Sequence, residues 1–152
     1  MSVCTFIAAD CPLKEVAPEK EYPLHINIDE GTIEDGGADD NYFLYTFRDV
    51  SSYTDKKYGV CLEWHYTQGR AKQILEYVKA ALEQTNVVEL WHVWLMDYYE
   101  YDERPVIRKR KLTFEQLSVN DIRELNDARI WNNADCNRPS FYCLQVERYF
   151  LL

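Results

Sequence analysis

Two segments of the chain alternate between apolar and polar residues, which is the period of a β-strand with one buried face. In the first, residues 24–29, the side chains of Leu24, Ile26 and Ile28 share a face, so we predict a half-buried strand. The second, residues 58–66, also separates into two faces. One face carries Tyr58, Val60, Leu62, Trp64 and Tyr66, and the other carries Cys61, Glu63 and His65.

Other stretches are rich in apolar or β-prone residues and also predict strands: 2–9, 42–47, 87–101, 106–112 and about 140–148. Up to Met96, both faces of the 87–101 segment are mostly apolar, as is typical of a central strand. Residues 102–105 predict a turn, so we expect 106–112 to pair back on this strand as a hairpin. Prolines and glycines indicate loops at 10–23 and 30–41.

A helical period predicts an amphipathic helix over 68–84, with Thr67 as its N-cap. Its apolar stripe is Ala71, Ile74, Leu75, Val78 and Leu82, and the residues expected to face water are Arg70, Lys72, Glu76, Lys79 and Glu83. Capped starts at Thr113 and Ser118 predict short helices near 114–117 and 119–126. The fold class is therefore α+β, in a single domain 1–152: a mainly antiparallel sheet of about five to seven strands, one long amphipathic helix (68–84) and short helices near 114–126.

Charge is spread unevenly along the chain. The formal net charge is −9, and residues 1–40 carry ten acidic residues against two lysines, whereas the rest is nearly neutral. An acidic surface of this kind is a poor partner for the phosphates of nucleic acid. The sequence offers neither a secretory signal nor a membrane-length apolar window, and its five cysteines are scattered with no CxxC pair. We therefore expect a reduced, cytoplasmic protein without a disulfide framework.

The densest acidic cluster lies in the predicted loop. It consists of Asp29, Glu30, Glu34, Asp35, Asp39 and Asp40, with no basic residue among them. A calcium loop would explain clustered carboxylates, but starting from either Asn27 or Asp29 the residues do not match the ligand positions of an EF-hand. Two interpretations remain: a solvated hairpin or loop that uses Gly36 and Gly37 for positive φ, or a surface that recognises a basic protein.

A second acidic region surrounds Tyr98, Tyr99 and Tyr101, at the end of the 87–101 strand. Tyrosines beside carboxylates suit protein recognition, because rigid rings anchor a partner and acids steer it. The alternative is that the rings cover the edge of the core. The only basic cluster, residues 108–111, is expected on an edge strand with its side chains divided between the two faces.

No cofactor, metal or nucleophile motif is present: the chain has no GxSxG, P-loop or GxGxxG. Glu63 and His65 are the weak candidates for catalysis, since they lie two apart on one strand face; a polar pair on an exposed face is the alternative. Cys61 shares that face with His65, so it is the thiol best placed to pair with a base. His92 is expected to be a hydrogen-bonded core histidine, on the opposite face from Glu89.

Three short segments, 36–41 (GGADDN), 89–94 (ELWHVW) and 138–141 (RPSF), resemble those of small uncharacterised bacterial proteins. In size and acidity the chain is also similar to bacterial immunity proteins. That second resemblance implies binding and neutralisation of a toxin domain, often a basic nuclease, and carries no site residues with it.

The sequence thus favours a non-enzymatic cytoplasmic protein-binding domain, with an immunity-type inhibitor as one form of it. Its acidic loop would engage a basic protein such as a toxin domain, without nucleic acid, membrane, cofactor or metal. The main alternative is a small enzyme or ligand-binding domain that uses Glu63 and His65 in a pocket of the sheet. A metal-binding module is a third hypothesis.

Overall fold

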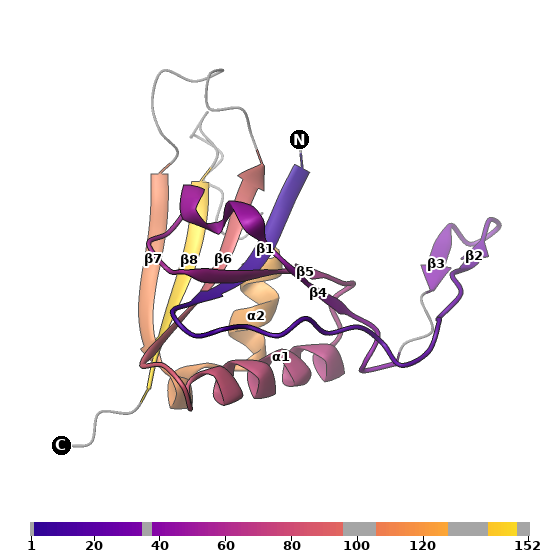
Figure 1. Ribbon diagram of the computed structural model, residues 1–152. Helices are drawn as coiled ribbons and strands as arrows, with labels where there is room; N and C mark the ends of the chain where they lie inside the picture. Colours follow the sequence, from indigo (N-terminus) through magenta and orange to yellow (C-terminus); the bar gives the residue numbers. More distant parts are fainter. Residues whose placement is uncertain (1, 35–37, 96–105, 128–139, 149–152) are drawn as a thin grey trace.

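A six-stranded sheet forms the centre of the protein. The computed structural model describes residues 2–34, 38–95, 106–127 and 140–148. Along the sheet the strand order is β4 (Phe43–Thr46), β5 (Tyr58–Glu63), β1 (Ser2–Ala9), β6 (Val87–Leu95), β8 (Ser140–Glu147) and β7 (Val106–Thr113) (Figure 1). Two helices, α1 (Gln68–Ala81) and α2 (Val119–Asn126), complete an α+β architecture. The predicted class is confirmed in this coarse form.

The order of the strands corrects the predicted hairpin between 87–101 and 106–112. Strand β8 lies between β6 and β7; it runs antiparallel to β6 and parallel to β7, so the sheet is mixed. Parallel neighbours need a crossover, and α2 lies in the chain between β7 and β8. Strand β7 is nevertheless at the edge, as predicted. Its basic residues divide between the faces: Arg110 pairs with Asp121 of α2, and Lys109 lies 3.7 Å from Glu89.

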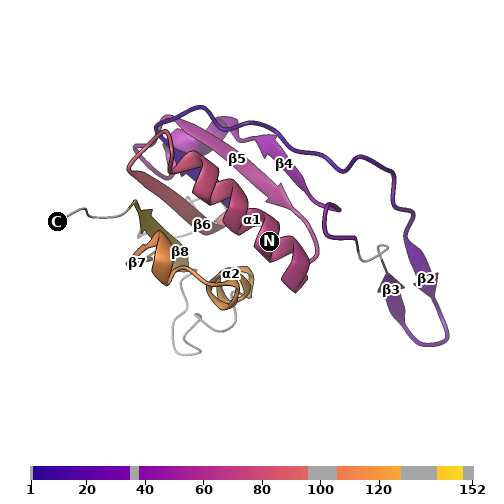
Figure 2. The ribbon, with the colours of Figure 1, turned by 90° about the horizontal axis from the view of Figure 1, so that it is seen from below.

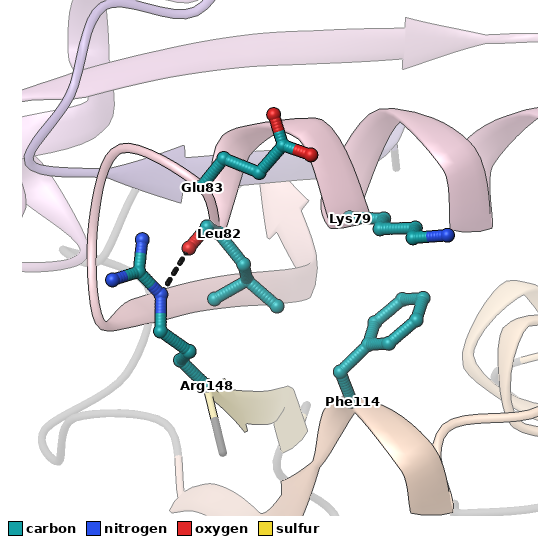
Figure 3. Close-up of a pocket in the computed structure, with 5 residues that line it drawn as sticks. All are labelled: Lys79, Leu82, Glu83, Phe114 and Arg148. Atoms are coloured by element: carbon teal, nitrogen blue, oxygen red, sulfur yellow. Dashed lines mark hydrogen bonds between the residues drawn. The ribbon is translucent and has the colours of Figure 1, made fainter.

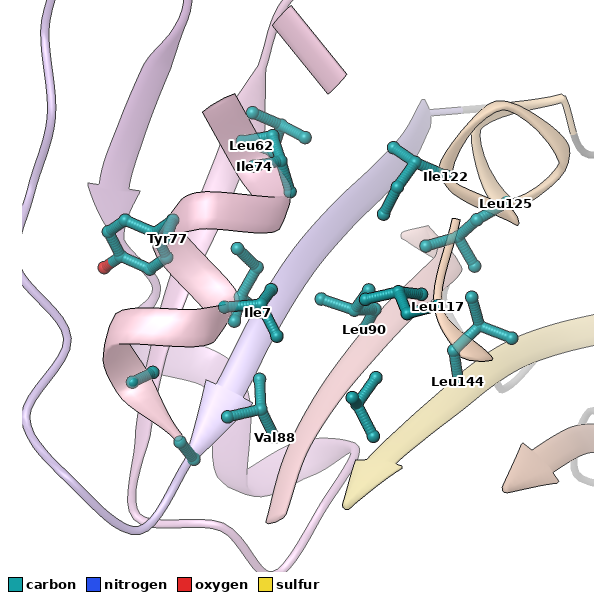
Figure 4. Packing of buried hydrophobic residues seen from close by; sticks show 14 of the residues in the cluster. Ile7, Leu62, Ile74, Tyr77, Val88, Leu90, Leu117, Ile122, Leu125 and Leu144 are labelled. Atoms are coloured by element: carbon teal, nitrogen blue, oxygen red, sulfur yellow. The ribbon is translucent and has the colours of Figure 1, made fainter. Parts of the chain in front are cut away.

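One face of the sheet packs against both helices. Figure 4 shows Ile7, Leu90 and Leu144, from three neighbouring strands, on the side where the apolar residues of the two helices pack. The helix residues that meet them include Ile74, Tyr77, Ile122 and Leu125. Figure 2 shows α1 alongside β5, with α2 nearer β8 and β7. The helical period predicted Ala71, Ile74, Val78 and Leu82 of this face, which are buried; Leu75 is half-buried, and Tyr77 was not predicted to be part of it.

The other face carries a smaller aromatic core. Phe6 stacks on Trp91 with ring centroids 5.8 Å apart, and Phe47 and Tyr53 contact Phe6 from the chain on either side of the 3-10 helix η1 (Arg48–Ser52). Val50 of η1 is buried against these rings. Both faces of β6 are therefore covered, which confirms its prediction as a central strand.

The helices begin where the caps predict. Thr67 accepts a hydrogen bond from the backbone N–H of Arg70, and both Thr113 and Ser118 form capping boxes, before η3 (Phe114–Gln116) and α2. Helix α1 ends at Ala81, however, so the prediction of a long helix reaching Gln84 is wrong. Residues 82–84 form turns that close on the carbonyls of Val78, Ala80 and Ala81.

A separate two-stranded hairpin projects from the sheet. It consists of β2 (His25–Asn27) and β3 (Thr32–Glu34), and it lies away from the sheet at the end of the segment that follows β1 (Figures 1 and 2). The prediction of a half-buried strand at 24–29 is therefore wrong. Leu24, Ile26 and Ile28 retain 59, 65 and 89% of their accessible surface, because no described element covers them. We call residues 24–34 the hairpin arm, and the sheet with α1, α2 and η1 the body.

Candidate functional site

The hairpin arm combines exposed apolar residues with negative charge. Its turn closes through Gly31, at a φ of +67° that favours glycine, and through the Glu30 N–H, which donates to Asn27 Oδ1 at 3.1 Å. Asp29 and Glu30 are exposed at this turn, beside Ile28. Isolated surface isoleucines are common, but a projecting ribbon with several of them is typical of an interaction surface.

The structure separates the six predicted acidic residues into two groups. Asp29 and Glu30 lie at the tip of the arm, and Glu34 ends β3. Asp39 and Asp40 lie instead where the chain rejoins the body, and Asp35 is outside the described residues. The acidic loop is therefore not one surface, and only its first part is presented on the arm.

Asp40 has a structural role at the base of the arm. Its Oδ1 accepts a hydrogen bond of 2.7 Å from the Tyr22 hydroxyl, and its Oδ2 accepts one from the Glu19 N–H at 3.4 Å. The Tyr22 hydrogen bond is the main reason that the pKa of Asp40 lies below its ordinary value. This carboxylate joins the chain entering the arm to the chain leaving it.

Arg70 fixes the same region from inside the body. The sequence predicted a residue facing water, but Arg70 is fully buried. Its Nε donates to the Ala38 carbonyl and its Nη1 to the His65 carbonyl, each at 2.9 Å. Asp39 lies so close to Gly69 that a Cβ there would overlap its carboxylate. The start of α1 is thus built around the returning end of the arm.

A cleft opens at the base of the arm and brings Glu63 and His65 together. It has a volume of about 360 Å³, and its lining residues are Tyr22, Leu24, Asn41, Phe43, Glu63, Trp64 and His65. Glu63 and His65 are exposed, and Trp64 is held by a hydrogen bond of 3.1 Å from its Nε1 to Asn126 Oδ1. We call this the arm-base cleft. Through Leu24 it is continuous with the apolar stripe of the arm.

His92 occupies the position that its sequence pattern predicts. It is 3% exposed and lies on the helix side of β6, where Thr5 Oγ1 is 3.1 Å from its Nδ1. Burial lowers the pKa of His92. Glu89 lies on the opposite face, as predicted, so the two do not form a dyad.

Glu89 is a buried carboxylate that the sequence did not single out. It is 3% exposed, and it accepts hydrogen bonds from the Thr54 hydroxyl and from Trp91 Nε1, at 2.5 and 3.0 Å. Lys109 is its ion-pair partner. These contacts account for the burial of its charge, and they give Glu89 a structural role. The sequence signal that could have indicated its burial is the position of a charged residue inside the apolar run 87–96.

A second cleft, of about 380 Å³, lies at the far end of α1 from the arm. Figure 3 shows Leu82 and Phe114 between the charged side chains of Lys79, Glu83 and Arg148, with Arg148 Nε donating to the Leu82 carbonyl. None of the candidate catalytic or partner-binding residues predicted from sequence lines this cleft. The other predicted residues, Tyr98, Tyr99 and Tyr101, fall outside the described residues.

Comparison of this chain with family models, with curated proteins and with solved structures gave no match. Within the described ranges, no three His, Cys, Asp or Glu residues come together in a way that could hold a metal ion. Neither described helix has the length and apolar character needed to cross a bilayer.

Proposed function

We propose that this chain is a non-enzymatic, cytoplasmic protein-binding domain that engages a basic partner through the hairpin arm and the arm-base cleft. The observation that supports it most is the exposure of Ile26 and Ile28 on a projecting ribbon that also carries Asp29 and Glu30. Burying these isoleucines in a partner would supply affinity, at about 25 cal/mol per Å² of apolar surface. The acids would steer a basic surface toward them.

The arm contains no Lys or Arg, so its partner should present basic residues around an apolar depression. A toxin domain neutralised by an immunity-type inhibitor is one partner with this chemistry. The cleft adds aromatic residues, Tyr22, Phe43 and Trp64, beside the carboxylate of Glu63. A basic side chain that enters beside the arm would meet both kinds of contact.

The test separates the apolar and charged parts of this surface. Partners retained from lysate of the source cells by the wild-type chain are identified, purified and titrated against four variants. Ile26→Ser with Ile28→Ser removes the apolar stripe, and Ile107→Ser, at an exposed isoleucine of β7, is its control. Asp29→Asn with Glu30→Gln removes charge and leaves the backbone hydrogen bond of the turn intact; Glu76→Gln on α1 with Glu83→Gln in the turn after it, both exposed, is its control.

We expect the isoleucine pair to weaken binding by at least about 30-fold, as for a central anchor of an interface. The charge pair should slow association by about tenfold at low salt and have little effect at high salt. The proposal fails if both arm variants bind every partner as tightly as their controls. Asp40 is unsuitable for this test, because its neutralisation also disturbs the base of the arm.

The arm-base cleft favours a second function, a small enzyme or ligand-binding domain that uses Glu63 and His65. The supporting observation is that both side chains line one cleft with aromatic neighbours. A fragment screen by NMR tests it: a ligand should shift the signals of the lining residues, and Glu63→Gln or His65→Ala should abolish the shift. Absence of any cleft-specific ligand in a broad screen would count against this function.

A further inference from the structure

Two cysteines on neighbouring strands bring their sulfur atoms into contact. Cys4 of β1 and Cys61 of β5 lie on the sheet face opposite α1, with their Sγ atoms 2.8 Å apart. This separation is shorter than the about 3.5–4.0 Å at which two carbon atoms make optimal contact. The residues are 57 positions apart in sequence, so the fold, and not a local motif, creates the pair.

The strand register explains the contact. Cys61 is directly opposite Phe6 in the antiparallel β1–β5 pair, which places Cys4 diagonally across from it on the same face. A disulfide has an S–S bond of about 2.05 Å, so the sulfur atoms need to approach by only about 0.8 Å. The other described cysteines have no such neighbour: the Cys11 thiol donates to the Ala81 carbonyl, and Cys143 is buried among apolar residues.

The two thiols differ in their readiness to react. The hydrogen bond between the two sulfur atoms lowers the pKa of Cys61, and the same hydrogen bond together with burial raises the pKa of Cys4. Cys61 is half-buried and partly accessible to solvent, whereas Cys4 is buried. A partly accessible thiol with a lowered pKa, in contact with a second thiol, is the arrangement of oxidation-sensitive cysteines.

We propose that Cys4 and Cys61 are an oxidisable dithiol that peroxide converts to a disulfide between β1 and β5. The Cys61 thiolate attacks one oxygen of hydrogen peroxide; the O–O bond breaks, and the departing hydroxide takes up a proton to leave as water. Cys61 is then a sulfenic acid. The Cys4 sulfur displaces its hydroxyl group, which leaves as water with the Cys4 proton. Two thiols lose two electrons, and one peroxide is reduced to two waters.

The bond would close a loop that contains the whole hairpin arm. Residues 5–60 lie between the two cysteines and include the arm and both chain segments that join it to the body. Such a bond restricts the unfolded chain, so oxidation should stabilise the native protein. We expect Tm to rise by about 5–10 °C.

The test treats the reduced full-length protein with hydrogen peroxide and maps its thiols. We expect one linked peptide pair that joins Cys4 to Cys61, with the other three cysteines still open to alkylation, and a Tm increase that dithiothreitol reverses. Cys4→Ser should stop the reaction at the Cys61 sulfenic acid, which dimedone traps. Cys61→Ser should give neither product, while Cys11→Ser and Cys143→Ser should react as the wild type does.

The wild-type map decides the matter even where a variant folds poorly. A linkage through any other cysteine overturns the proposal, as does a disulfide only between molecules. It is also overturned if Cys61 proceeds to the sulfinic acid while Cys4 remains a free thiol.

Discussion

Strand β5 in the body and strand β2 in the arm have the same alternating sequence pattern, but the apolar face of β5 is buried and that of β2 is exposed. In β5, Val60 and Leu62 alternate with polar or small residues and are buried against α1; in β2 and its turn, Ile26 and Ile28 alternate in the same way and face solvent. Alternation therefore determines which side chains share a face. It does not determine whether another element covers that face, which depends on residues far away in the sequence.

The largest expected difference between these regions is in stability. Ile7→Ala removes a side chain that is 1% exposed at the centre of the helix-side core, and we expect it to lower the free energy of unfolding by about 2–5 kcal/mol. Ile26→Ala removes the same atoms from the arm and should change it by less than about 0.5 kcal/mol. Urea denaturation of the two variants measures both. Equal losses would mean that the arm isoleucine is covered in solution.

Arg70 connects the body to the returning end of the arm, so its replacement should lower the stability of both regions. Arg70→Met removes the donor to the part-buried Ala38 and His65 carbonyls, and we expect a loss of about 1–3 kcal/mol in the free energy of unfolding. Hydrogen exchange should also become faster in the arm than in β6. Lys72→Met, two residues along α1 at an exposed position, is the control and should do neither.

The body was predictable from sequence where its signals are local. Alternation predicted β5, apolar and β-prone stretches predicted the other strands of the body, and the N-caps Thr67 and Ser118 predicted where α1 and α2 begin. The neighbour of β7 was not predictable, because the short turn at 102–105 favoured a hairpin and β8 comes from much later in the chain. The local pattern of residues 87–112 does not indicate that a strand from the end of the chain lies between β6 and β7.

The site was predictable only in part, for the same physical reason. Glu63 and His65 do line one cleft, but much of its wall comes from Tyr22, Leu24, Asn41 and Phe43, in segments that precede β5 in the chain. Arg70 has a charged side chain at a position that would face water in an isolated helix. The carbonyls that accept its hydrogen bonds belong to Ala38, where the chain returns from the arm, and to His65, between β5 and α1. The face of Cys61 was readable, whereas its pairing with Cys4 required the β1–β5 register.

The pH dependence of the body should reflect His92. Its pKa is lowered in the folded state, so below about pH 6.5 the unfolded chain binds the proton more readily. The contribution of His92 to stability is thus complete above that pH and is lost as the pH falls toward the folded pKa. The slope is at most about 1.4 kcal/mol per pH unit. Denaturation midpoints between pH 7.5 and 5 measure it.

His92→Gln should remove this part of the slope, whereas His25→Gln and His65→Gln, at exposed positions, should retain it. The same slope in His92→Gln as in the wild type would assign the effect to another group.

The base of the arm should show the smallest and most acidic transition. The Tyr22 hydrogen bond lowers the pKa of Asp40, so the stabilisation that it provides is present above the ordinary carboxyl pKa and is lost as the pH falls through the lowered value. Tyr22→Phe should raise the pKa of Asp40 toward its ordinary value, as followed by NMR of the carboxyl carbon. Hydrogen exchange should accelerate at the arm base while β6 keeps its protection.

Tyr58→Phe, at an exposed tyrosine at the start of β5, should leave the pKa of Asp40 unchanged. If β6 lost protection to the same extent, the arm and the body would open as one cooperative unit, and the distinction between them would not extend to their dynamics.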